Sequence, residues 1–331
     1  KHNLNQLFNT QNGQRRTVKE RNNRPQPTIG VFDSGFGGLT VLRALLPLIP
    51  EARYIYLGDT ARLPYGSKSH DTIARYAVSS AKFLHEQGAD LLVVACNTAT
   101  ALALEDIQQS LPIPVIGVVQ PGAHAASIST RSQKKSVVLS EARERAVSES
   151  DGAESKGLRL SSVQPDGSPP KVLVLATQAT VQSHAYTRAL AAHNLNAYEK
   201  ACPLLVPLVE EGWINHPVTD EVLKIYLTEA LTEAPNAQIL LLGCTHYPLL
   251  EPAIRRTLAT LNHPLTVIDS AKATAQAVAA HIGTNPPGLK TQNSKPTAAF
   301  YATDSIEKFE RLGSGFLGQP VTGVRHVDLG G

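Results

Sequence analysis

The amino-acid sequence predicts an α/β protein of two similar domains, each built on a mainly parallel sheet. Short apolar runs that end in small or polar residues alternate with segments of helical periodicity from Thr28 onward, which is typical of parallel sheets covered by helices. The pattern repeats approximately, because 63 positions separate Asp33 from Cys96 and 67 separate Thr177 from Cys244. A chain of 331 residues is also longer than one compact domain usually needs.

Eight apolar runs are expected to form strands, at residues 28–32, 53–57, 90–95, 115–118, 172–176, 239–242, 265–268 and 298–301. The clearest helix between them places Ile73, Ala77 and Leu84 on one face. It begins beside Ser69, a residue type that caps helices, and stops at Gly88. We expect such a helix to pack on a sheet.

The expected domain limits follow from changes in composition along the chain. Residues 1–27 are expected to be a disordered basic leader. The first α/β domain is expected to comprise residues 28–122 and about 252–325, and the second domain residues 123–251. Residues 130–170 are rich in Ser, Glu, Arg, Lys, Gly and Pro with few large apolar residues, which indicates a flexible insertion in the second domain.

Charge and apolar content exclude several classes of partner. Up to Arg24, six Lys and Arg residues accompany a single Glu, so about −2 of the formal net charge of +3 belongs to the rest of the chain. We therefore expect no nucleic-acid partner. No apolar run could span a bilayer and residues 1–27 contain no signal-peptide pattern, so we expect no membrane partner. Three cysteines without a CxxC pair suit free thiols in the cytoplasm.

Two of the cysteines follow strands in matching places. Cys96 ends the run at 91–95, and Cys244 ends the run at 239–243. Ligands bind at the carboxyl ends of parallel strands, and a following helix favours a thiolate there. A buried structural cysteine is the common alternative, but two thiols in equivalent positions favour a function. Cys202 lies in an apolar stretch and is interpreted as a packing residue.

Polar residues beside these strand ends suit an amino acid as the ligand. Asp33 and Ser34 end the first strand before three glycines, so the carboxylate is suited to an ammonium group and the loop to an anion. Asn97, Thr98 and Thr245 offer short donors for a carboxylate, although helix capping explains the two threonines equally well.

His246 could polarise the nearby thiol of Cys244 or be held by hydrogen bonds inside the fold. A zinc site fails on the number of ligands, because Cys-x-His supplies only two. The lysines lie in helix-like or polar stretches, which argues against pyridoxal phosphate. We therefore expect no metal and no cofactor.

Two thiols presented from opposite domains into the cleft between them would suit inversion at a carbon atom. One base removes a proton while the other delivers one from the far side. The residues alone also permit a thiol hydrolase or a redox pair.

Four motifs occur in order along the chain: FDSGFGGLTV at 32–41, YLGDTARLPYG at 56–66, CNTAT at 96–100 and GCTHYPL at 243–249. Together they closely resemble the aspartate/glutamate racemase family, and within it the glutamate racemases. The resemblance implies interconversion of L- and D-glutamate without metal or pyridoxal phosphate, which supplies D-glutamate for bacterial peptidoglycan synthesis in the cytoplasm.

The resemblance also implies roles for individual residues. Cys96 would face D-glutamate and Cys244 would face L-glutamate, while Asp33 and His246 would assist proton transfer. Glu210 would be an acid from the second domain, with its neighbour Glu211 as the alternative. The residues expected to line the substrate are Asp33, Ser34, Tyr65, Gly66, Asn97, Thr98, Thr245 and His246.

The chain departs from the family pattern at Ala176, where Gly is usual, at His184, where a small residue is usual, and in the insertion at 130–170. Fine specificity therefore stays open, and an aspartate or broad-specificity racemase is an alternative. A second alternative is a catalytically silent amino-acid-binding regulatory protein, against which the two intact thiols argue. A homodimer and a peptidoglycan-precursor activator are the further partners that the resemblance suggests.

Overall fold

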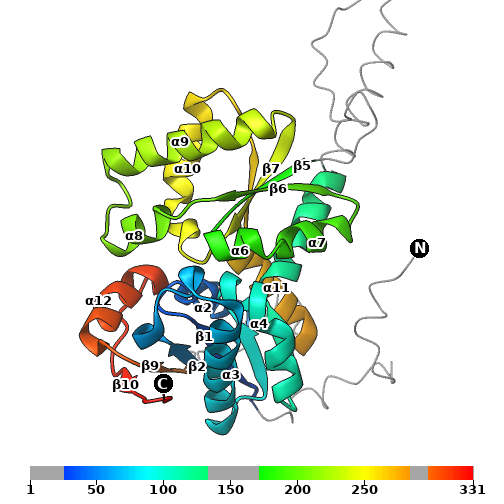
Figure 1. Cartoon of the computed structure of the whole chain (residues 1–331). Helices are drawn as coiled ribbons and strands as arrows, with labels where there is room; N and C mark the ends of the chain where they lie inside the picture. The colour runs from blue at the N-terminus through cyan, green and yellow to red at the C-terminus, as the bar shows by residue number, and fades with distance from the viewer. Residues whose placement is uncertain (1–25, 133–170, 284–296, 331) are drawn as a thin grey trace, which may run out of the picture.

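The computed structural model of the chain describes residues 26–132, 171–283 and 297–330. The leader up to residue 25 and residues 133–170 of the expected insertion lie outside the described residues. The described chain forms two α/β domains, one above the other in Figure 1. The predicted fold class is confirmed, because the strands pair in two separate sheets and every pairing is parallel.

The first sheet has six strands in the order β10-β9-β2-β1-β3-β4. Their bounds are β1 Thr28–Asp33, β2 Arg53–Gly58, β3 Leu91–Val94, β4 Val115–Gly117, β9 Thr297–Ala302 and β10 Arg325–His326. The second sheet has four strands in the order β6-β5-β7-β8. Their bounds are β5 Lys171–Ala176, β6 Asn196–Ala201, β7 Ala237–Gly243 and β8 Thr266–Asp269.

All eight predicted strands are present, with ends that differ by at most two residues. The prediction missed β6 and β10. Strand β6 lies at an edge of its sheet, where half-burial lets it carry Glu199 and Lys200, so it shows no apolar run. Strand β10 is only two residues long.

Helices flank both sheets: α2 Leu39–Leu45, α3 His70–Glu86, α4 Asn97–Ser110, a helix over 119–132, α6 Gln178–Gln182, α7 Ala185–Ala191, α8 Leu205–Glu210, α9 Pro217–Glu233, α10 Glu251–Thr260, α11 Ser270–Ile282 and α12 Ile306–Leu317. Short 3₁₀ helices are η2 Thr60–Arg62, η3 Tyr65–Ser67 and η4 Tyr247–Leu250. Helix α3 buries the predicted apolar face. Ser69 holds the N-cap position, but its hydroxyl bonds to the Thr72 hydroxyl at 3.0 Å instead of to a backbone N–H.

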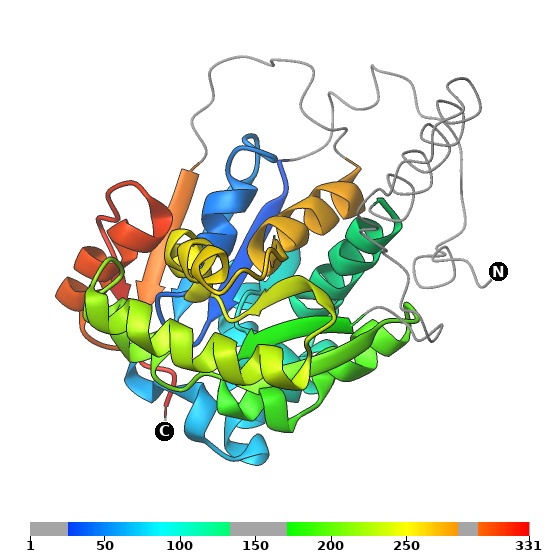
Figure 2. The same cartoon turned by 90° about the horizontal axis from the view of Figure 1, so that it is seen from above.

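The expected return of the chain to the first domain at about residue 252 is wrong. Strand β8 pairs with β7, so the chain remains in the second sheet as far as Asp269. It returns only with α11, which packs against α2 of the first domain (Figure 2). Residues 130–132, expected to begin the insertion, continue the helix over 119–132, and Thr130 donates from its hydroxyl to the Ala126 carbonyl at 3.0 Å.

One apolar cluster extends across both domains. It includes Phe36 and Leu39 of the first domain together with Leu205, Leu242 and Leu250 of the second. Because burial of apolar surface stabilises this contact, the cluster fixes the two sheets relative to each other. The carboxyl ends of β1 and β3 therefore lie near those of β5 and β7, as the cross-domain contacts below show.

Candidate active site

The two strand-end cysteines lie in corresponding but chemically different turns. Cys96 is the N-cap of α4, and its Sγ accepts the Ala99 N–H at 3.4 Å. Cys244 precedes the short 3₁₀ helix η4, and its Sγ lies 3.9 Å from Nδ1 of His246. Each cysteine is only 5% exposed. The repeat thus places both thiols as predicted, but only Cys96 has an α-helix behind it.

The glycine loop after β1 lies directly on the second domain. A Cβ added at Gly37 would meet the Thr245 hydroxyl oxygen at 2.2 Å and Nδ1 of His246 at 2.6 Å. The Thr40 hydroxyl donates to the Thr245 carbonyl at 3.0 Å. Only a residue without a side chain permits this approach. The first domain therefore meets the turn that carries Cys244.

Asp33 has one buried carboxylate oxygen without a hydrogen-bond partner among the described residues. Its Oδ2 accepts the Gly35 N–H at 2.8 Å, whereas Oδ1 has no partner. Burial raises the pKa of Asp33, although His246 acts to lower it. An unpaired buried acceptor costs free energy and therefore needs an explanation. A cationic ligand group at Oδ1 would supply the missing donor.

The thiol of Cys96 contacts Ser34 and is affected by the charge of Asp33. The Ser34 hydroxyl oxygen is 3.5 Å from its Sγ. Burial and the negative charge of Asp33 raise the pKa of Cys96 to about 12, although hydrogen bonds from Ser34 and from the start of α4 act to lower it. The start of α4 acts on the pKa of Cys96 in the expected direction, but burial and the negative charge of Asp33 outweigh it. The raised pKa disfavours a thiolate on Cys96.

His246 connects the other thiol to an acid of the second domain. Its Nε2 lies 3.1 Å from Oε1 of Glu210. Burial acts to lower the pKa of His246, but Cys244 and Glu210 together raise it to about 10. Burial acts to raise the pKa of Glu210, but the hydrogen bond from His246 prevails and lowers it. The raised pKa favours the imidazolium form of His246. Glu211 is exposed beyond the end of α8, whereas Glu210 is the acid that contacts His246.

Asn97 crosses the domain boundary through one end of its amide. Its Oδ1 accepts the Tyr186 hydroxyl at 2.6 Å, while Nδ2 is buried without a partner among the described residues. Tyr186 lies on α7 of the second domain. Nδ2 of Asn97 is a free donor and Oδ1 of Asp33 is a free acceptor, a pair of groups that matches the carboxylate and the ammonium of an amino acid.

Three threonine hydroxyls from both domains meet at Thr98. Its Oγ1 lies 3.0 Å from that of Thr177 and 3.2 Å from that of Thr180, which are 3.0 Å from each other. Capping does not explain Thr98, because Cys96 holds the N-cap of α4, and Thr245 also caps no described helix.

The sequence prediction missed Thr177, Thr180 and Tyr186 as site residues. The repeat carried a signal for Thr177, which follows β5 as Asp33 ends β1. Nothing in the local sequence pointed to Tyr186, whose place at the site depends on the contact between domains.

Tyr65 and Gly66 also lie at this boundary. The Tyr65 hydroxyl donates to Oδ2 of Asp59 at 2.5 Å, and Asp59 pairs with Arg62 at 2.9 Å. A Cβ at Gly66 would lie 3.2 Å from Cβ of Thr177. Gly66 is therefore placed against the threonine cluster, whereas the hydroxyl of Tyr65 is already engaged.

Three further residues named in the sequence analysis make none of the contacts described above. Cys202 is fully buried in the shared apolar cluster, and its Sγ lies 3.6 Å from the Lys200 carbonyl. Ala176 is buried at the end of β5. His184 is exposed with φ +52° at the start of α7.

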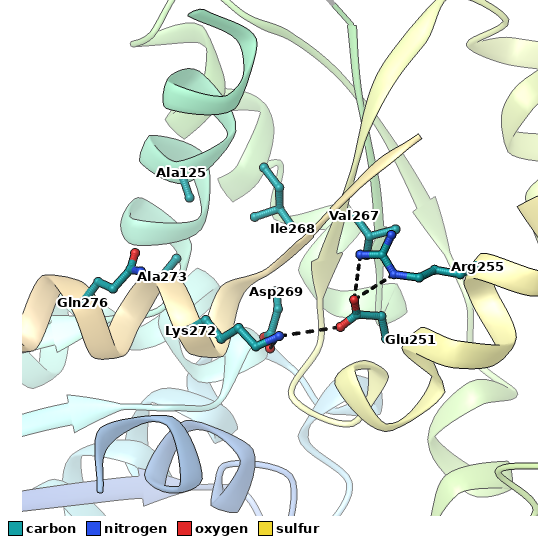
Figure 3. Close-up of a pocket in the computed structure, with 9 residues that line it drawn as sticks. All are labelled: Ala125, Glu251, Arg255, Val267, Ile268, Asp269, Lys272, Ala273 and Gln276. Atoms are coloured by element: carbon teal, nitrogen blue, oxygen red, sulfur yellow. Dashed lines mark hydrogen bonds and ion pairs between the residues drawn. The ribbon is translucent and has the colours of Figure 1, made fainter. Parts of the chain in front are cut away.

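A hollow of about 230 Å³ lies apart from the thiols and contains none of the predicted site residues. It lies between α10, β8, α11 and the helix over 119–132, and Figure 3 shows Glu251 between Arg255 and Lys272 there. Within the described ranges, no group of three or more His, Cys, Asp or Glu side chains could hold a metal ion. The described helices also include none long and apolar enough to cross a membrane.

The sequence matches a family model described as Asp/Glu/Hydantoin racemase over residues 39–165 and 159–278. The chain belongs to this racemase family. The two matched segments correspond to the two halves of the approximate repeat, and each contains one of the strand-end thiols.

Relatives in this racemase family match nearly the whole chain. The glutamate racemase of Koribacter versatilis is 46% identical, covering 93% of this chain and 99% of the relative. The Francisella tularensis glutamate racemase, whose crystal structure was solved with D-glutamate, is 32% identical in sequence with a TM-score of 0.71. The match covers 92% of this chain and 98% of that relative. The Escherichia coli glutamate racemase, solved with L-glutamate and the activator UDP-MurNAc-ala, is 26% identical with a TM-score of 0.60. The match covers 88% of this chain and 96% of that relative.

Proposed function

We propose that this member of the racemase family interconverts L- and D-glutamate with Cys96 and Cys244 as two opposed bases. The observation that carries the proposal is that each thiol ends a strand of a different sheet and each cysteine turn touches the opposite domain. The similarity to glutamate racemases along nearly the whole chain supports the choice of substrate.

Substrate binding follows from the groups that lack partners. The ammonium would donate to Oδ1 of Asp33, and the α-carboxylate would accept from Nδ2 of Asn97 and from Ser34 or Thr245. The hydroxyls of Thr98, Thr177 and Thr180 would bind the side-chain carboxylate. Gly66 closes the site against Thr177, and Tyr65 supports that loop.

The proton transfer uses one thiolate and one thiol in each turnover. The Cys244 thiolate takes the Cα proton of L-glutamate, and the Cys96 thiol gives its proton to the opposite face of the carbanion. The products are D-glutamate, a Cys244 thiol and a Cys96 thiolate. The reverse reaction begins from that state, and the proposal assigns no metal or cofactor to either direction.

The surroundings of the thiols suit this cycle. The His246 imidazolium, held by Glu210, would stabilise a thiolate on Cys244. The negative charge of Asp33 opposes a thiolate on Cys96. An ammonium on Asp33 would offset that charge, so bound substrate makes the Cys96 thiolate easier to form.

The biological setting belongs to the same proposal. We expect D-glutamate formed here to enter bacterial peptidoglycan synthesis in the cytoplasm. The activator bound by the Escherichia coli relative makes UDP-MurNAc-ala the compound to test first as an activator. A homodimer stays a prediction, which sedimentation equilibrium of the purified protein would check.

Circular dichroism of L- and D-glutamate with the purified protein tests the function directly. With a strong chelator and no pyridoxal phosphate, we expect each enantiomer to approach the racemic mixture. In deuterated water, inverted product should carry deuterium at Cα from its first appearance. Aspartate serves as the comparison substrate, and faster turnover of aspartate would favour the aspartate-racemase alternative. Activity that disappears with chelator and returns with zinc would contradict the proposal.

A further inference from the structure

Tyr186 contacts residues adjacent to both cysteines. Its hydroxyl donates to Oδ1 of Asn97, which follows Cys96, at 2.6 Å. Its ring lies against Gly243, which precedes Cys244, because a Cβ added at Gly243 would meet Cε2 of the ring at 2.9 Å. Tyr186 is fully buried. One side chain of α7 therefore joins the two thiol-bearing turns across the domain boundary.

The hydrogen bond decides which end of the Asn97 amide is free. A neutral phenol donates to an acceptor, and burial raises the pKa of Tyr186, so the hydroxyl keeps its proton throughout the working pH range. If the amide turned over, Nδ2 would donate to the phenol oxygen, the phenol would have to donate to another acceptor, and Oδ1 would take the place that Nδ2 now holds. The observed arrangement leaves Nδ2 buried and without a partner in the described part of the chain. The bond thus holds the amide with its N–H groups available to a ligand.

We propose that Tyr186 is a positioning residue that fixes the Asn97 amide with its N–H groups toward the substrate carboxylate, an inference that rests on the proposed glutamate racemisation. Without the phenol, the amide can present Oδ1 to the carboxylate, and two acceptors then face each other. Tyr186 thereby also makes carboxylate binding depend on contact between the domains, because the phenol belongs to one domain and the amide to the other.

The Tyr186→Phe variant removes only the hydroxyl. We expect KM for both enantiomers to rise about tenfold, the equivalent of one lost hydrogen bond, with a smaller change in kcat and no shift of the pH profile. Tyr54→Phe is the matched control, because Tyr54 is also fully buried and donates to the Ile49 carbonyl at 2.8 Å, far from the thiols. Both variants should lose some thermal stability, but only Tyr186→Phe should raise KM.

A double-variant comparison separates positioning from a general loss of packing. In an Asn97→Ala background, adding Tyr186→Phe should raise KM no further, because the amide it positions is already absent. An additional tenfold rise in that background would overturn the proposal, as would an unchanged KM in Tyr186→Phe alone. Both outcomes require a wild-type protein that racemises glutamate. An inactive wild type would contradict the proposed function itself, whereas the variants test only the role of Tyr186.

Asn97→Asp tests the orientation without altering the tyrosine. The aspartate keeps an acceptor for Tyr186 but places an anionic oxygen where Nδ2 lies. We therefore expect a larger rise in KM than in Asn97→Ala, because two carboxylates then repel each other. Wild-type KM in Asn97→Asp would show that Nδ2 does not face the substrate, and the proposal would be wrong.

Discussion

Nε2 of His246 lies 3.1 Å from Oε1 of Glu210, and this pair joins the end of α8 to the turn that carries Cys244. Both partners are largely buried, with 7% and 18% of their side chains exposed. The carboxylate therefore holds a positive imidazole beside a thiol, and the charge state of that imidazole depends on Glu210.

Replacing Glu210 by Gln should lower the pKa of His246 from about 10 toward its ordinary value of 6.5. In the wild type, this raised pKa contributes stability that is fully present below pH 6.5 and is lost as pH rises through about 10. Thermal unfolding of Glu210→Gln should thus show a loss on the order of 1–3 kcal/mol near neutral pH, which shrinks toward pH 10. Glu211→Gln, one position along and exposed, should unfold like the wild type.

Cys96→Ser and Cys244→Ser should each lose racemisation by about 10²–10⁴-fold, because a hydroxyl is a far poorer base than a thiolate at neutral pH. Deuterium exchange should separate the two sides. Residual exchange without inversion should favour L-glutamate in Cys96→Ser and D-glutamate in Cys244→Ser. Cys202→Ala should keep its activity, since Cys202 lies in the shared apolar cluster. A serine variant that folds and racemises at the wild-type rate would remove that thiol from the mechanism.

Asp33→Asn should lower the pKa of Cys96 below about 12, because the negative charge of Asp33 is a cause of its rise. Burial remains and is the larger cause, so the pKa should not reach that of an exposed thiol. Ultraviolet titration of the thiolate measures the change, made in a background that carries Cys202→Ala and Cys244→Ser so that Cys96 is the only thiol. The same variant should raise KM by weakening ammonium binding. An unchanged titration curve would show that Asp33 does not affect the pKa of Cys96.

Gly37→Ala should impair catalysis far more than folding. The added methyl would lie 2.2 Å from the Thr245 hydroxyl and 2.6 Å from Nδ1 of His246, so these side chains must shift or the two domains must move apart at the site. We expect kcat/KM to fall about 10²-fold or more through misplaced groups. Gly315→Ala is the control, because no atom of the described residues lies within 4 Å of an added Cβ there and alanine favours the helix α12. Near-normal activity in Gly37→Ala would mean that the contact is not needed.

The amino-acid sequence by itself determined the features that depend on neighbours along the chain. The apolar runs located eight strands, and the rule for carboxyl ends placed Asp33, Cys96 and Cys244 at strand ends, because burial and strand geometry act within a few residues. The repeated spacing also indicated two domains before any contact was known. Motifs that resemble a known family then identified the reaction expected at those positions.

The tertiary structure alone decided the features that depend on which surfaces meet. It assigned β8 to the second sheet, selected Glu210 over Glu211, and brought Tyr186 to Asn97. The pKa of Cys96 belongs to this group as well. The helix end, which is visible in the sequence, lowers this pKa, but burial and Asp33 raise it by more, and both depend on the folded structure. Electrostatic interactions and hydrogen bonds act through space, so residues distant in the sequence determine the chemistry of the thiols.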